Sequence, residues 1–118
     1  MQHGNKNRTF GRPRSQRTAL IRGLAVSLIR DGKIKTTEAK AKELRPFIEK
    51  LVTRSKANTV AARRIVASRL GEPADIVVKK IFEVIAPKYT TRNGGYTRVI
   101  KMGRTPAGRD EAVIEFVE

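Results

Sequence analysis

The chain has 118 residues, which suits one domain that buries roughly two thirds of the surface its unfolded form exposes. Lys and Arg number 26 against 11 Asp and Glu, and the resulting net charge of +15 indicates a polyanionic partner. Because there is no Cys and His3 is the single His, disulfides, thiolate metal sites and paired-imidazole sites are excluded. We therefore expect no metal and no cofactor, and a reducing compartment such as the cytosol.

The first residues have the composition of an extended arm. Residues 1–14 contain almost no apolar side chains and include Gly4, Gly11 and Pro13, so they cannot bury enough surface to fold alone. The sequence thus predicts a basic arm over residues 1–14 and a single domain over residues 15–118. Since the arm has no acidic residue, its only evident energetic use is docking onto phosphates, where each cation releases condensed counterions.

The start of the chain also has features of targeting segments. A basic stretch precedes an apolar run over residues 19–29, but Arg22 interrupts it, and an Arg-rich start without acids also suits an organellar transit peptide. Removing residues 1–30 takes away seven basic residues and no acids and leaves +8, so targeting cannot explain the whole charge. No run approaches the roughly 18 apolar residues of a membrane span.

Apolar residues at helical spacing predict two helices after the arm. The first follows Ser15, its expected N-cap, and ends near Gly32. The second follows the cap residue Thr37 and continues through Val52. Pro46 lies inside this second helix, where it removes one hydrogen bond and is expected to kink or split the helix.

The same spacing predicts two further helices. The third starts at Asn58 or Thr59 and ends at Leu70. The fourth starts at Pro73, which suits a first turn, and is stopped by Pro87.

Three shorter segments are typical of strands, namely residues 33–36, 96–102 and 112–117. Residues 93–95, Asn-Gly-Gly, form a turn signal ahead of the second strand, and about eight residues connect the second strand to the third. We expect these two strands to pair and the first to join them, in an order that the sequence leaves open. The predicted fold is α+β, with about four helices beside a small mixed sheet of about three strands.

No catalytic constellation assembles from these elements. Residues 94–95 match no phosphate-binding loop and are better explained as a backbone turn that needs positive φ. Glu38 with Lys42, and Arg45 with Glu49, stand four residues apart, as solvated ion pairs on a helix do. We therefore expect that the protein is not an enzyme and has no small-molecule substrate. If it were an enzyme, an active-site carboxylate should have a strongly raised pKa.

Basic side chains are the candidate binding residues. Arg outnumbers Lys in the arm, which favours bidentate phosphate contacts and suits folded RNA. His3 and Tyr96 could stack on bases, although a lone His is usually solvated and Tyr96 suits the core equally. Basic residues on helix faces fit both RNA contact and a solubilising surface. The predicted RNA-binding residues are His3, Lys6, Arg8, Arg12, Arg14, Arg17, Arg22, Lys35, Lys40, Lys42, Arg45, Arg63, Arg64, Arg92, Tyr96, Arg98, Lys101 and Arg104.

Two other classes of binding protein remain open at this point. The sequence contains no convincing helix-turn-helix, zinc finger or basic-zipper pattern, yet a nonspecific DNA-architectural protein would share the charge. Such a protein should bind duplex DNA as well as structured RNA. A protein-interaction module would use its helix faces instead and should keep its principal complex when RNA is removed.

Four segments together resemble the bacterial ribosomal protein L17 family of the large subunit. They are residues 1–3, 8–27, 34–45 (IKTTEAKAKELR) and 94–99 (GGYTRV). The likeness covers essentially the whole chain in order. It implies a noncatalytic, cytoplasmic component of the large ribosomal subunit, bound to ribosomal RNA and neighbouring ribosomal proteins toward the outer surface near the peptide exit.

The family's basic positions can be carried over by position. Gln2 and Gln16 stand where the family usually has Arg and His, and residues 103–111 also depart from its pattern, so no contacts are carried over there. The matching basic positions are Arg8, Arg12, Arg17, Arg22, Lys35, Lys40, Lys42, Arg45 and Arg98.

Overall fold

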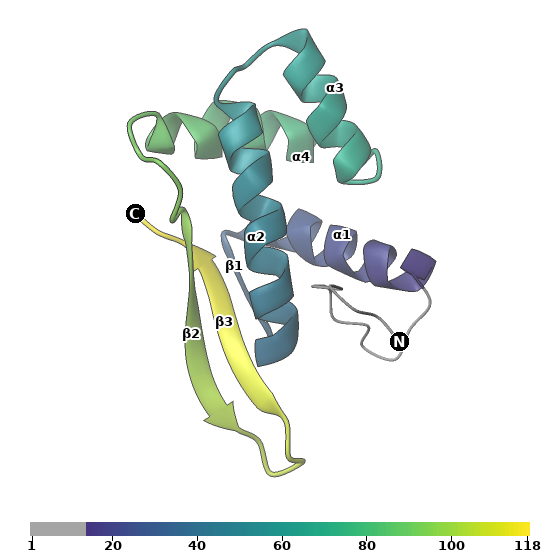
Figure 1. Cartoon of the computed structure of the whole chain (residues 1–118), viewed down its shortest axis with the longest axis vertical. Helices are drawn as coiled ribbons and strands as arrows, with labels where there is room; N and C mark the ends of the chain where they lie inside the picture. Colours follow the sequence, from purple (N-terminus) through teal and green to yellow (C-terminus); the bar gives the residue numbers. More distant parts are fainter. Residues whose placement is uncertain (1–13) are drawn as a thin grey trace, which may run out of the picture.

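The computed structural model describes residues 14–118 (Figure 1). They form four α-helices and three strands, which confirms the predicted α+β fold. The predicted arm lies outside the described residues, except for Arg14. The helices are α1 (Arg14–Asp31), α2 (Glu38–Ser55), α3 (Val60–Arg69) and α4 (Asp75–Lys80), which continues into η1 (Ile81–Ile85) and η2 (Ala86–Tyr89); the strands are β1 (Lys33–Thr37), β2 (Thr97–Arg104) and β3 (Asp110–Phe116).

The sheet has the order β1-β3-β2 and is antiparallel throughout, not mixed as the sequence suggested. Strands β2 and β3 form a hairpin, and β1 pairs with the other edge of β3, so Ile114 of β3 lies between Ile34 and Val99. The register of β2 shifts between Lys101 and Gly103, and this bulge keeps Gly103 within the strand. The connection is therefore shorter than predicted.

Helix α2 crosses one face of the sheet, and the other helices pack around it (Figure 1). Its residues Leu44, Ile48 and Val52 are fully buried, in one core cluster with Ile29 of α1 and Ile114 of β3. These α2 residues recur at helical spacing, so one face of the helix supplies the centre of the core. The opposite face remains available for polar and charged side chains.

Pro46 was expected to kink or split α2, and the expectation of a split was wrong. The helix continues from Glu38 to Ser55, and its predicted N-cap Thr37 accepts a hydrogen bond from the Lys40 N–H at 3.3 Å. Both Pro46 and Lys42 are exposed, so the carbonyl that loses its partner belongs to a residue on the solvent side. Core packing on the other face holds the helix together.

The ends of the other helices differ in part from prediction. Ser15 lies inside α1 and is not its N-cap, whereas Thr59 caps α3 and accepts a hydrogen bond from the Ala62 N–H at 3.1 Å. The fourth helix does not stop at Pro87 but continues as a 3-10 turn to Tyr89. The wider π-helical turn before it relieves the crowding that a proline ring causes in an α-helix.

Candidate nucleic-acid interface

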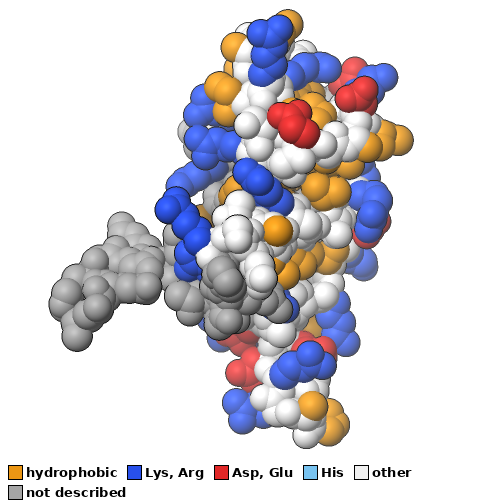
Figure 2. Space-filling model, turned by 90° about the vertical axis from the view of Figure 1, so that its right-hand side faces the viewer, with side chains coloured by type: hydrophobic (Ala, Val, Ile, Leu, Met, Phe, Trp, Pro, Cys, Tyr) orange, Lys and Arg blue, Asp and Glu red, His pale blue; other side chains and the backbone are white. Residues whose placement is uncertain are grey.

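Basic side chains cover much of the surface. Figure 2 shows one face of the molecule, on which Lys and Arg side chains are far more numerous than Asp and Glu. The described residues among the predicted site lie on α1, β1, α2, α3, β2 and the segment ahead of β2. The other four, His3, Lys6, Arg8 and Arg12, lie outside the described residues.

All the residues predicted on the sheet and on α2, except Lys40 and the aromatic Tyr96 ahead of β2, are paired with acids. The Glu38 carboxylate lies 2.7 Å from Lys42 Nζ and 3.6 Å from Lys101 Nζ, so it joins α2 to β2. The hydrogen bond from Lys42 holds the pKa of Glu38 below its ordinary value. The remaining pairs are Lys35–Glu111 at 3.4 Å, Arg45–Glu49 at 3.5 Å, Arg98–Glu115 at 2.9 Å and Arg104–Asp110 at 3.3 Å.

These ion pairs do not exclude RNA contacts. The basic partner of each pair is exposed, and such exposed pairs contribute about 0–1 kcal/mol. A phosphate competes readily for a cation held this weakly. The ion pairs therefore position the basic side chains but leave them able to bind phosphates.

The side chains of four predicted basic residues have neither a carboxylate partner nor a hydrogen bond among residues 14–118, and all but the half-buried Lys40 are exposed. They are Arg14 at the start of α1, Lys40 in α2, Arg64 in α3 and Arg92 ahead of β2. Without a compensating acid, a phosphate can bind these side chains directly.

Arg22 and Arg63 are held by other groups. The Arg22 Nε–H donates to the Arg69 carbonyl at 3.1 Å and so ties α1 to the end of α3. Arg63 lies over the Phe82 ring at 5.0 Å, and its Nη2 donates to Asn58 at 3.2 Å. Arg17 lies half-buried in α1.

Tyr96 must be removed from the candidate site. It is 1% exposed, its ring centroid lies 5.1 Å from that of Tyr89, and its hydroxyl lies 3.0 Å from Thr53 Oγ1. A ring buried in this way cannot stack on a base. The alternative use in the core, which the sequence left open, is the one that the structure favours.

The structure adds three cations that the sequence prediction missed. Lys50, Arg54 and Arg69 line a groove of about 800 Å³ between α2 and α3. The spacing of Lys50 and Arg54 on one face of α2 was the available signal. Arg69 could not be joined to them from sequence, because the packing of α3 against α2 brings it there.

Glu49 connects α2 with the turn ahead of β2. Its carboxylate accepts hydrogen bonds from the Gly95 N–H at 3.0 Å, the Thr97 N–H at 3.2 Å and the Thr97 hydroxyl at 2.8 Å. Gly94 and Gly95 have φ of 78° and 65°, the positive values predicted for this turn. Glu49 therefore forms the predicted helix pair with Arg45 and also holds the turn ahead of β2 against α2.

The electrostatics of these carboxylates are not those of an acid catalyst. Burial raises the pKa of Glu49, but the hydrogen bonds from Thr97 and Gly95 outweigh burial, so its pKa lies below the ordinary value. The pKa of Asp31 is also lowered, by its hydrogen bond with Arg30. General acids at neutral pH require the opposite shift.

Within residues 14–118, no three or more His, Asp or Glu side chains are grouped so as to hold a metal ion. None of the described helices combines the length and the apolar character needed to cross a membrane.

The fold and surface define a small basic α+β protein suited to a polyanion, and comparison with known proteins identifies the family. The model of the family "Ribosomal protein L17" matches residues 20–117. A protein of Persephonella marina named "Large ribosomal subunit protein bL17" is 51% identical over 120 positions, covering 100% of this chain and 96% of that protein. A protein with the same name from Sulfurihydrogenibium is 48% identical, and the match covers 100% of this chain and 98% of that protein. Another from Clostridium beijerinckii is 47% identical, and the match covers 94% of this chain and 97% of that protein.

The chain therefore belongs to the ribosomal protein L17 family, as the resemblance indicated. Members of this family are structural, noncatalytic components of the ribosome, which confirms the prediction that the chain is not an enzyme.

Proposed function

We propose that the chain is a cytoplasmic, structural constituent of the large ribosomal subunit that binds and stabilises folded ribosomal RNA. The names of its relatives and the match along its length support the place in the large subunit. Neighbouring ribosomal proteins are the second class of partner that this position implies.

One observation carries the RNA-binding part of the proposal. Within residues 14–118, exposed Arg and Lys side chains without carboxylate partners are spread over α1, α2, α3 and the loop before β2, as Arg14, Lys50, Arg64 and Arg92 illustrate. A charge of +15 disfavours the compact state through self-repulsion unless a polyanion neutralises it. Ribosomal RNA supplies phosphates from several directions, which suits cations distributed in this way.

The basic arm adds phosphate contacts at the start of the chain. Lys6, Arg8 and Arg12 carry positive charge with no acid nearby in sequence. Fixing this segment on RNA costs about 1–2 kcal/mol of conformational entropy per residue, so several phosphate contacts must offset it. The arm accordingly binds between RNA segments, where phosphates approach it from more than one side.

A competition experiment separates this function from DNA architecture. Full-length protein is mixed with purified large-subunit ribosomal RNA and an equal mass of duplex DNA at one salt concentration. Preferential binding to the folded RNA is expected. Equal binding to both would instead support a nonspecific DNA-architectural protein.

A further inference from the structure

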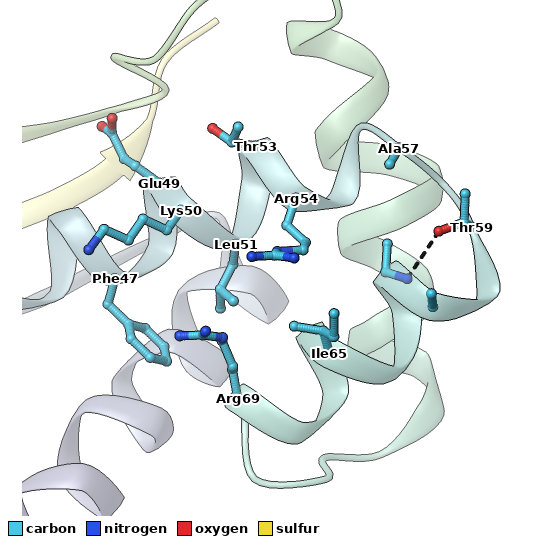
Figure 3. A pocket seen from close by; sticks show the side chains of 12 residues that line it. Phe47, Glu49, Lys50, Leu51, Thr53, Arg54, Ala57, Thr59, Ile65 and Arg69 are labelled. Atoms are coloured by element: carbon cyan, nitrogen blue, oxygen red, sulfur yellow. Dashed lines mark hydrogen bonds between the residues drawn. The ribbon is translucent and has the colours of Figure 1, made fainter.

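The groove between α2 and α3 differs from the rest of the basic surface because cations and apolar side chains share it. Lys50 and Arg54 line it from α2, and Arg69 lines it from the last turn of α3. Figure 3 shows Arg54 and Arg69 projecting into the space between the two helices. The groove is therefore a concave site and not simply a charged face.

The groove carries uncompensated positive charge. Lys50, Arg54 and Arg69 are exposed, and none has a carboxylate partner within residues 14–118. Glu49 is the acid among the described lining residues, but it turns away from the groove (Figure 3) and binds Gly95 and Thr97. An anion placed between the two helices would relieve the repulsion among the three cations.

The apolar part of the groove includes an aromatic ring. Phe47 is half-buried against the core, Leu51 is 2% exposed and forms the floor, and Ile65 is 36% exposed. Phe47 and Ile65 lie beside Arg69 (Figure 3). A phosphate group alone needs no apolar surface to bind, whereas the base and ribose of a nucleotide pack against one.

Resting on the RNA-binding function proposed above, we propose that this groove holds an unpaired nucleotide of the ribosomal RNA. Its phosphate lies against Arg54, Arg69 and Lys50, and its base or ribose lies against Phe47 and Ile65. A duplex keeps its base faces stacked inside the helix, so the groove selects a loop, a bulge or a strand end.

The neighbouring helix positions one of these cations. The hydrogen bond from Arg22 Nε to the Arg69 carbonyl, 3.1 Å long, ties the last turn of α3, which carries Arg69, to α1. An acidic peptide could also meet the cations. The flat ring of Phe47 beside them favours a nucleotide, since every base has a face that stacks on an aromatic ring.

Chemical probing of assembled subunits tests this inference. Large subunits are purified from cells whose only copy of the protein is wild type or the triple variant Lys50→Ala/Arg54→Ala/Arg69→Ala, and their RNA is probed with dimethyl sulfate and a ribose-acylating reagent. We expect one or a few unpaired nucleotides, protected by the wild type, to become roughly tenfold more reactive in the variant.

Two further variants make the test specific. The triple variant Lys33→Ala/Lys88→Ala/Arg109→Ala removes the same charge from exposed side chains outside the groove lining, and it should leave those nucleotides protected. Phe47→Leu keeps every charge and most of the core contact but removes the aromatic ring, so it should expose the same nucleotides. Should the groove triple variant fail to assemble, Phe47→Leu decides by the same readout.

The outcomes separate this inference from the function on which it rests. Unchanged reactivity in subunits that contain the groove variants would overturn the inference. It would also be overturned if ultraviolet cross-links joined residues 47–54 to a protein, because an acidic polypeptide would then fill the groove. Absence of the wild-type protein from large subunits would refute the proposed function itself.

Discussion

At the scale of single residues, Glu49 links elements that lie far apart in the sequence. Its carboxylate accepts hydrogen bonds from Gly95 and Thr97 and lies 3.5 Å from Arg45 Nε, so one side chain joins α2 to the start of β2. These groups stabilise the charged form, which is why the pKa of Glu49 lies below its ordinary value although burial opposes this.

Glu49→Gln should lower the free energy of unfolding by about 1–3 kcal/mol at neutral pH, because a neutral amide replaces a charged acceptor. A folded-state pKa below the ordinary 4.5 means that the contribution is complete above that pH and is lost as the pH falls through the lowered value. Urea unfolding at several pH values should therefore show the difference from wild type narrowing in acid. Glu83→Gln, at an exposed position, is the matched control, and equal effects of both variants would contradict this role.

Tyr96 provides a second test at this scale. Tyr96→Phe removes the hydroxyl that lies 3.0 Å from Thr53 Oγ1 and should cost about 1 kcal/mol of stability. Because the ring is buried, assembly into the large subunit should not change, as measured by the amount of variant in purified subunits. A folded variant with an assembly defect would return Tyr96 to the RNA interface.

At the scale of elements, α2 organises the molecule. One face supplies Leu44, Ile48 and Val52 to the core, and the other carries Lys50 and Arg54 to the groove. The same helix thus sets the fold and presents charge, and Pro46 interrupts its hydrogen bonding without breaking it.

Pro46→Ala should raise the free energy of unfolding by about 1–3 kcal/mol, because it restores a helix hydrogen bond and removes ring crowding. Thermal and urea unfolding of the full chain measure this directly. A loss of stability would mean that core packing depends on the helix geometry that the proline imposes.

The arm is tested by charge reversal. Changing Arg8, Arg12, Arg14 and Arg17 together to Glu should abolish incorporation into the large subunit while circular dichroism shows a folded body. Normal incorporation of this variant would remove the arm from the mechanism.

The helices could be predicted where local signals in the sequence, such as caps and apolar spacing, match the packing of the core. The spacing of Leu44, Ile48 and Val52 and the cap at Thr37 are visible in the sequence, and the structure has both. The expected split at Pro46 was wrong because packing against the sheet outweighs the local penalty. Arg69 was missed for a similar reason: it lines the groove with Arg54 only through the packing of α3 on α2.

At the scale of the whole molecule, the charge of +15 makes RNA binding dependent on salt. Neutralising Arg8, Arg12, Arg14 and Arg17 to Ala should reduce the slope of log affinity against log salt by roughly 3, if each contacts one phosphate. Titrations of purified ribosomal RNA at several salt concentrations measure this slope. An unchanged slope would show that these side chains release no counterions on binding.

The proposed place of the chain is the large ribosomal subunit. The most direct test is sedimentation of the tagged full-length protein in a cell-extract gradient under conditions that separate the subunits, with deoxyribonuclease and mild ribonuclease controls. We expect near-stoichiometric comigration with the large subunit that deoxyribonuclease does not change. Absence from that peak, with association with chromosomal DNA instead, would contradict it.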